Sequence, residues 1–139
     1  MAVVKASFKF SKNSHKHMIG VHPILVTMAE KALAESPVDF GVIKNGGFRT
    51  AEEQHELFLK KRSKLDGFIQ ISHHQLGNAI DLVPYIDGKF TWSDRKAFEQ
   101  INAVVLKVWK EMKVRGVQLT WGGSWETFYD PAHYQIKNK

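Results

Sequence analysis

The sequence predicts an α+β fold, in which a small, mostly antiparallel sheet has about three helices packed on it. Segments with apolar residues at helical spacing alternate with short apolar runs bounded by turn residues, a pattern typical of helices and strands mixed along one chain. The chain has 139 residues, of which 43% are hydrophobic, and this suits a single core. No repeat, low-complexity tract or Pro/Gly-rich linker divides it, so we expect one domain over residues 1–139.

Two helices are expected in the first half of the chain. Pro23 suits the first turn of a helix that should run to about Glu35. Its apolar residues fall on one stripe, at Ile24, Leu25, Met28 and Ala32. A capping-box pattern that starts at Thr50 opens the second helix, which we expect to turn Leu57 and Phe58 inward.

A longer helix is expected in the second half. Ser93 is its predicted N-cap and Gly116 its predicted end. Between them the apolar residues recur at helical spacing, at Phe98, Ile101, Val105, Val108 and Met112.

Four apolar segments predict strands, at residues 40–43, 79–83, 117–121 and 133–136. Pro84 should stop the second strand, because proline has no N–H to donate to a sheet. Turns are predicted at Asp87-Gly88 and at Asn45-Gly46-Gly47, and residues 64–71 are expected to form a loop. We expect the sheet to carry the chemically active side chains.

The net charge of the chain limits the kinds of partner that we expect it to bind. A net charge of +6 and a pI near 9.6 favour an anionic partner: nucleic acid, an acidic membrane surface or an acidic envelope polymer. The basic residues are scattered apart from the run Lys60-Lys61-Arg62, and no RNA-recognition, zinc-finger or helix-turn-helix signature accompanies them. We therefore expect no nucleic-acid partner and keep nucleic-acid binding as an alternative only.

Neither a signal peptide nor a membrane span is recognisable in the sequence. We expect a monomer that accumulates in the cytoplasm without inserting into the membrane, so another factor must give it access to a substrate outside. The chain has no cysteine, which excludes disulfides and thiolate ligands. Any bound metal must therefore be held by nitrogen and oxygen atoms.

Three side chains suit a catalytic metal ion. His74 and Asp81 flank a turn at Gly77, and His133 lies far downstream. These are the ligand types and the number of a catalytic zinc, which takes about three protein ligands and leaves one position open for water. Asp81 lies on an otherwise apolar strand, where a buried carboxylate requires a cation or several hydrogen bonds, although a structural role for this acid is the alternative.

The charges around this set suggest a hydrolytic mechanism. Asp130 is the candidate base that takes a proton from water, and Arg49 is the candidate cation for a tetrahedral oxyanion. Arg49 could instead pair with Glu52 or Glu53 at the start of its helix. Ser72, just ahead of His74, is placed to hydrogen-bond a substrate carboxylate or amide.

These residues carry a resemblance that spans nearly the whole chain. The motifs are Ser72-x-His74-x-x-Gly77-x-Ala79-x-Asp81, Gly47-Phe-Arg49-Thr50-x-x-x-Gln54 and Trp121-Gly-Gly-x-Trp125-x-x-Phe128-x-Asp130-x-x-His133. The chain resembles the zinc peptidases that cut peptidoglycan stem peptides, the D-alanyl-D-alanine carboxypeptidase and L-alanyl-D-glutamate endopeptidase superfamily. The short phage-endolysin branch is the most similar.

The resemblance implies a role for each matching residue. His74, Asp81 and His133 would bind Zn²⁺, Asp130 would be the catalytic acid/base, and Arg49 would contact substrate or the oxyanion. Ser72 and Gln54 would line the substrate site. The implied activity is hydrolysis of the bond between L-alanine and D-glutamate in the stem peptide, which lyses the bacterial host of a phage.

Several alternatives stay open. D-alanyl-D-alanine carboxypeptidase or dipeptidase activity is the rival within enzymes, and a non-catalytic wall-peptide module is the rival outside them. Some phage relatives carry a calcium-responsive loop before the last histidine, but residues 124–129 are short and poor in such ligands. We expect the positive charge itself to supply adhesion to anionic envelope polymers.

Overall fold

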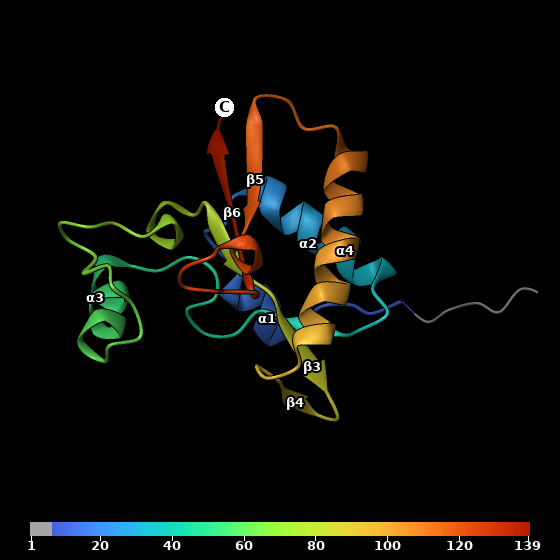
Figure 1. The fold of residues 1–139 in the computed structure, drawn as a ribbon, viewed down its shortest axis with the longest axis horizontal. Helices are drawn as coiled ribbons and strands as arrows, with labels where there is room; N and C mark the ends of the chain where they lie inside the picture. The colour runs from blue at the N-terminus through green and yellow to red at the C-terminus, as the bar shows by residue number, and fades with distance from the viewer. Residues whose placement is uncertain (1–6) are drawn as a thin grey trace, which may run out of the picture.

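The computed structural model describes residues 7–139, which form two small antiparallel sheets and four α-helices (Figure 1). This arrangement is the α+β class that the sequence predicts, with two sheets in place of one and an unpredicted short helix, α1. The helices are α1 (Lys12–His17), α2 (Pro23–Glu35), α3 (Ala51–Leu59) and α4 (Arg95–Met112), with 3₁₀ turns η1 (His73–Leu76) and η2 (Gly122–Ser124).

Each sheet has three strands. The first has the order β1-β3-β4, and the second has the order β2-β6-β5. The strands are β1 (Phe40–Gly41), β2 (Ala79–Asp81), β3 (Val83–Ile86), β4 (Lys89–Phe90), β5 (Val117–Trp121) and β6 (His133–Asn138). The strands β2 and β3 follow one another directly, so a single extended segment joins the two sheets.

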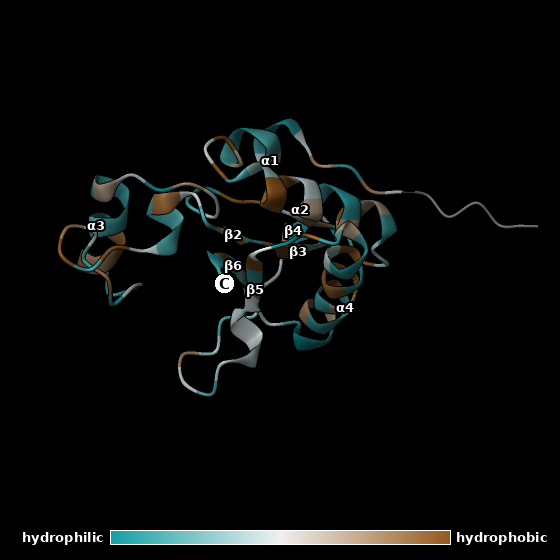
Figure 2. Cartoon of the chain, turned by 90° about the horizontal axis from the view of Figure 1, so that it is seen from above, coloured by the Kyte–Doolittle hydropathy of each residue, from teal (hydrophilic) through white to brown (hydrophobic). Residues whose placement is uncertain are grey.

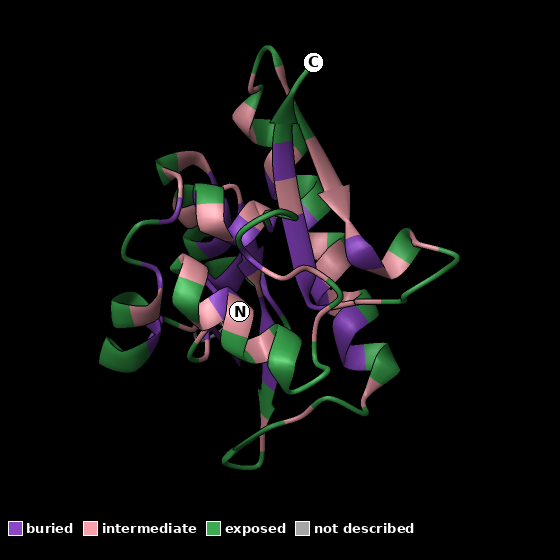
Figure 3. Cartoon of the chain, turned by 90° about the vertical axis from the view of Figure 1, so that its left-hand side faces the viewer, coloured by how far each residue is buried: buried purple, intermediate pink, exposed green. Residues whose placement is uncertain are grey.

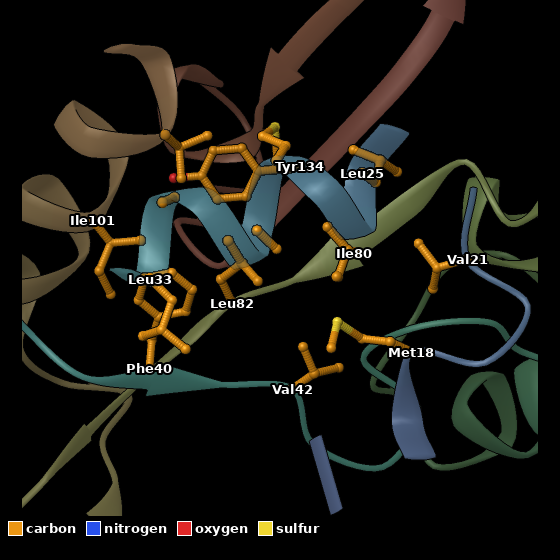
Figure 4. Packing of buried hydrophobic residues seen from close by; sticks show 14 of the residues in the cluster. Met18, Val21, Leu25, Leu33, Phe40, Val42, Ile80, Leu82, Ile101 and Tyr134 are labelled. Carbon is orange, nitrogen blue, oxygen red and sulfur yellow. The ribbon is translucent and has the colours of Figure 1, made fainter. Parts of the chain in front are cut away.

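The main core lies between the helices α2 and α4 and the strands (Figures 2 and 4). Ile80 and Tyr134, opposite each other on β2 and β6, are 0% exposed and belong to this core. Burial of each such side chain contributes roughly 1.5–3 kcal/mol. The Tyr134 hydroxyl donates to Asn102 Oδ1 of α4 at 3.4 Å, which satisfies its one polar atom. Figure 3 shows the buried residues concentrated on the strands and the inner helix faces.

The predicted helices are confirmed, with one correction to the packing of α3. α2 has the expected bounds, and the capping box between Thr50 and Glu53 is present at the start of α3. α3 does not turn Phe58 inward, since Phe58 is 37% exposed and Gln54 is the buried residue of this helix. The helix packs on a loop through a polar side chain, which an apolar pattern does not reveal.

The long helix α4 begins and ends at residues other than those predicted. Asp94 is its N-cap, one residue after Ser93, and accepts from the N–H of Ala97 at 3.0 Å. The helix ends at Met112, where Lys113 takes the left-handed conformation with φ 51°. Gly116 also has a positive φ, 73°, but it lies in the loop beyond the helix.

One strand prediction is wrong. Residues 79–83 do not form one strand stopped by Pro84, because β2 ends at Asp81 and β3 contains Pro84 opposite Phe40 of β1. The other three strand predictions are confirmed, although β1 is shorter and β6 longer than expected. None of the helices within residues 7–139 combines the length and the apolar composition needed to cross a bilayer.

Candidate metal centre and active site

His74, Asp81 and His133 converge on one point. His74 Nε2 lies 3.3 Å from His133 Nδ1 and 3.3 Å from Asp81 Oδ1, and His133 Nδ1 lies 3.2 Å from the same oxygen. Metal bonds of about 2.0–2.1 Å in a tetrahedron place the ligand atoms about 3.3 Å apart. The three atoms are therefore spaced as ligands of one metal ion.

The remaining ring nitrogens fix which atom of each histidine faces this point. Nδ1 of His74 lies 2.8 Å from the carbonyl oxygen of Gly47, and an oxygen of this kind can only accept. Nε2 of His133 lies 2.8 Å from Gln135 Oε1. Both rings thus donate outward and keep a lone pair for the metal, an arrangement that orients metal-bound imidazoles.

Strand register places two of the ligands. Asp81 and His133 are directly opposite each other in the β2–β6 pair, and residues opposite each other share a face of the sheet. Their neighbours Ile80 and Tyr134 point to the other face, into the core. The sheet carries these two ligands as expected, but His74 does not lie on it.

His74 lies on the 3₁₀ turn η1. Ser72 caps this turn, since its hydroxyl accepts from the N–H of His74 at 3.2 Å. The turn ends at Gly77, whose φ is 72°. A Cβ there would lie 2.5 Å from the carbonyl oxygen of Gly20, so only glycine fits the bend between His74 and Asp81.

Arg49 holds the other oxygen of Asp81. Its Nη2 lies 3.5 Å from Asp81 Oδ2, while its Nη1 donates to Gln54 Oε1 at 3.0 Å and its Nε donates to the Asn45 carbonyl at 2.6 Å. Within residues 7–139 it pairs with neither Glu52 nor Glu53, which removes the alternative of a simple helix-start ion pair. Burial lowers the pKa of Arg49 and Asp81 raises it in part, yet the guanidinium stays charged.

The titration of the ligands reflects how close they lie. In the metal-free site both imidazoles can also be protonated on their inward nitrogens. Burial alone would raise the pKa of Asp81, but the charge of a protonated His74 and a hydrogen bond from a protonated His133 outweigh it and hold this pKa well below its usual value. Burial lowers the pKa of His133, and the hydrogen bond and charge of Asp81 reverse the effect and raise it. A negative charge thus attracts cations to this point.

Asp130 enters the same cavity but is not one of the three converging ligands. Burial raises the pKa of Asp130, and the nearby charge of Asp81 raises it further. Gly122 makes room for it, because a Cβ on Gly122 would collide with the backbone oxygen of Asp130. An acid with a raised pKa beside a metal site is suited to proton transfer.

The cavity has a volume of about 460 Å³ and reaches from the metal-binding point to the loop after α3. Ser72 lines it, as expected. Gln54 lies behind its wall: the residue is 0% exposed, and its Nε2 donates to Ser63 Oγ at 2.8 Å and to the Leu65 carbonyl at 2.9 Å. The Oε1 of Gln54 accepts a hydrogen bond from Arg49, so both the oxygen and the nitrogen of this amide have partners.

Sequence reasoning missed several residues of the site. Gln135 could have been found, because it lies two residues after His133 on a strand and so shares its face. The Gly47 carbonyl carries no side-chain signal. Trp92 also lines the cavity and was not expected there. His73, Trp125 and Phe128, which the sequence offered as possible substrate contacts without assigning them, line it too, and Nδ1 of His73 is buried with no hydrogen-bond partner in residues 7–139.

Two imidazoles and a carboxylate around one point, with an unligated acid and an arginine in the same cavity, are the constellation of a metal-dependent hydrolase. Comparison with known proteins narrows this class. The sequence profile of the phage L-alanyl-D-glutamate peptidase family matches residues 6–137, and the chain belongs to this family.

Individual relatives agree with the profile. The chain is 37% identical over 137 residues to the L-alanyl-D-glutamate peptidase of Escherichia phage T5. This alignment covers 94% of this chain and 90% of that protein. It is 29% identical to the peptidoglycan L-alanyl-D-glutamate endopeptidase CwlK of Bacillus subtilis (strain 168), over 84% of this chain and 73% of that one. The crystal structure of the Serratia marcescens L-Ala D-Glu endopeptidase ChiX superposes with a TM-score of 0.77 and 30% identity, covering 94% of this chain and 91% of that one.

Proposed function

We propose that this protein is a zinc endopeptidase that hydrolyses the amide between L-alanine and D-glutamate in the stem peptides of bacterial peptidoglycan, as a phage lysis enzyme. The observation that carries the proposal is the spacing of His74 Nε2, Asp81 Oδ1 and His133 Nδ1, 3.2–3.3 Å apart, with Asp130 in the same cavity. The relatives named above favour this bond over the D-alanyl-D-alanine bond.

The three ligand atoms suit zinc because they are two nitrogens and one oxygen in a buried setting, with no thiolate in the chain. When bound there, zinc supplies Lewis acidity, polarising a carbonyl and lowering the pKa of water to roughly 7. The neutral imidazoles of His74 and His133 remain ligands only while their inward nitrogens are unprotonated.

Asp130 is the proposed acid/base. Its carboxylate takes the proton from the attacking water and returns it to the leaving nitrogen of D-glutamate, so the amine departs neutral. The raised pKa of Asp130 favours this exchange, because a group transfers protons in both directions most efficiently when its pKa is nearer the operating pH. A non-catalytic wall-binding module has no use for such a group.

Arg49 is the proposed stabiliser of the oxyanion. It lines the cavity, its side chain is 14% exposed, and one of its nitrogens already orients the carboxylate of Asp81. A fixed cation beside a developing negative charge lowers the barrier without reorganising in the reaction. Ser72, which lines the cavity, is the proposed hydrogen-bonding partner of a substrate amide or carboxylate.

For Gln54, contact with substrate is the expectation from the family resemblance, and the geometry supports a different role. Its side chain is buried behind Arg49 and links Arg49 to the loop after α3 through hydrogen bonds. We assign Gln54 as a positioning residue that holds the guanidinium toward Asp81.

The charge of the protein supplies a proposed second contact with its substrate. A net charge of +6 attracts the chain to anionic polymers of the cell envelope, where the peptidoglycan lies. Such attraction is screened by salt, with a Debye length of about 8 Å at physiological ionic strength. Binding to whole envelopes should therefore weaken with added salt well before hydrolysis of a short soluble peptide does.

Mass spectrometry of fragments released from purified peptidoglycan tests the proposed bond. Products with a new C-terminal L-alanine and a new N-terminal D-glutamate are expected from the zinc-loaded protein. Release of D-alanine instead would identify a carboxypeptidase, and the absence of any soluble fragment would refute the enzymatic function.

A further inference from the structure

A second cavity adjoins the proposed active site. It has a volume of about 510 Å³ and lies between α1, β1 and the β3–β4 hairpin, which forms the lower end of the molecule in Figure 1. Ile43 and Lys44 line both this cavity and the one that holds the metal ligands. The two cavities therefore adjoin at Ile43 and Lys44, and we call the two together the groove. The volume of the second cavity is within the roughly 300–1,000 Å³ typical of ligand sites.

Three exposed aromatic side chains of the β3–β4 hairpin and the segment after it line this groove. Tyr85 and Phe90 are partners across the β3–β4 pair, with ring centroids 5.0 Å apart, and both line the second cavity. Trp92, two residues after Phe90, lines the first cavity. Their exposed fractions are 41%, 42% and 54%. Covering rings of this size with a ligand is favourable, because it removes a large apolar surface from water.

Phe90 is held in place by the strand beneath it. A Cβ on Gly41 would lie 3.0 Å from the Phe90 ring, so the ring rests directly on the backbone of β1. The aromatic surface is thus a fixed part of the cavity wall and needs no ordering before a ligand binds.

Polar groups surround these rings. Asn13 and His17 of α1, together with Asp39, Lys9 and Lys44, supply amide, imidazole, carboxylate and ammonium groups around the second cavity. Within residues 7–139 the side chains of Asn13 and His17 make no hydrogen bond of their own. A sugar ring has the complementary surface, because its C–H faces are apolar and its edge carries hydroxyl and acetamido groups.

We propose that the second cavity binds the glycan strand of peptidoglycan, taking an N-acetylated amino sugar against Tyr85 and Phe90. This inference rests on the proposed function and deepens it. L-Alanine is the stem-peptide residue joined to the glycan, so a sugar lies only one residue from the bond between L-alanine and D-glutamate. With that bond at the metal ligands, we infer that the sugar extends into the adjoining second cavity, since Ile43 and Lys44 line both cavities.

The consequence is a preference for stem peptides that still carry their sugars. The experiment measures kcat/KM of the zinc-loaded protein on a disaccharide-tetrapeptide and on the same tetrapeptide without sugar. We expect the sugar to raise kcat/KM roughly tenfold or more, the scale of one or two aromatic contacts. Phe90→Ser should lower this ratio toward one, and Asn13→Ala, on an exposed helix surface that tolerates substitution, should lower it less.

Phe68→Ser is the matched control. Phe68 is 57% exposed, more than Phe90, but it lines neither cavity, so the ratio should not change. Equal kcat/KM for both substrates in the wild type, or a ratio that neither Phe90→Ser nor Asn13→Ala changes, overturns the glycan site and leaves the endopeptidase intact. Cleavage of neither substrate overturns the proposed function and the glycan site with it.

Discussion

Arg49 and Asp81 form a pair in which each oxygen of the carboxylate has a separate task. Asp81 Oδ2 faces Arg49 Nη2 at 3.5 Å, and Oδ1 faces the two imidazole nitrogens at 3.2 and 3.3 Å. The guanidinium therefore fixes the carboxylate through the oxygen that does not face the metal position. Arg49 thus orients one member of the ligand set, in addition to the oxyanion contact proposed for it.

Removal of the metal should abolish activity. We expect about one zinc per chain, loss of hydrolysis after strong chelation, and recovery when zinc is added. Replacing His74, Asp81 or His133 with Ala should lower the zinc content measured by elemental analysis, because each supplies one of the three converging atoms. His22→Ala is the control, since His22 caps α2 away from the cavity. Full activity of the metal-free protein would refute the mechanism.

Asp130→Asn separates catalysis from metal binding. The change keeps the shape of the side chain and removes its capacity to accept a proton, so hydrolysis should fall by roughly 10²–10⁴ while zinc content stays constant. Burial and the charge of Asp81 raise the pKa of Asp130, so its ionised form lowers stability above that pKa. The variant should therefore unfold at the same temperature as the wild type or higher at neutral pH. Loss of zinc would show instead that Asp130 is a ligand.

Arg49→Lys should be a poor substitute although it keeps the charge. A compact ammonium cannot reach Asp81, Gln54 and the Asn45 carbonyl together, whereas the guanidinium does. We expect kcat to fall by roughly 10²–10³, the scale for losing an oxyanion donor. Arg95→Lys, on the exposed surface of α4, is the control and should keep wild-type kinetics. Near wild-type turnover of Arg49→Lys would reduce this residue to a structural ion pair.

Gln54→Ala tests the positioning role. It removes hydrogen bonds to Arg49, Ser63 and Leu65 inside a buried site, at a cost of about 1–3 kcal/mol in the free energy of unfolding. A lower kcat with little change in KM should accompany this cost, because Arg49 loses its orientation. Gln70→Ala, on the exposed loop, should change neither quantity. If Gln54→Ala raises KM and leaves kcat constant, Gln54 contacts the substrate after all.

The stability of the metal-free protein and the extra stability given by zinc should change with pH in opposite directions. In the metal-free protein Asp81 raises the pKa of His133 above its unfolded value of 6.5, so this stabilisation is complete below about pH 6.5 and is lost as pH rises through the raised pKa. Zinc binds the neutral imidazole, so its contribution grows over the same range. Thermal unfolding from about pH 6 to pH 8 should show a falling Tm without zinc and a growing zinc-induced increase. Parallel slopes would contradict this linkage.

The sequence by itself determined the residue types of the site. A carboxylate on an apolar strand, one histidine before a glycine turn, a second histidine far downstream and an acid three residues before it limited the chemistry to a few choices. Local signals with a short range also predicted well, as for α2, the capping box of α3 and β5, because caps and apolar periodicity act within about one or two turns.

Tertiary structure alone decided how these groups meet. The β2–β6 register sets Asp81 opposite His133, and the Gly47 carbonyl fixes the ring of His74, although neither contact is local in sequence. Pro84 belongs to β3 because this segment pairs with β1, a strand that lies far away in the sequence. Gln54 is buried because the loop after α3 folds over it. Pairing and burial depend on what lies across the fold, which is why residue spacing predicted the ligands and the folded chain defined their geometry.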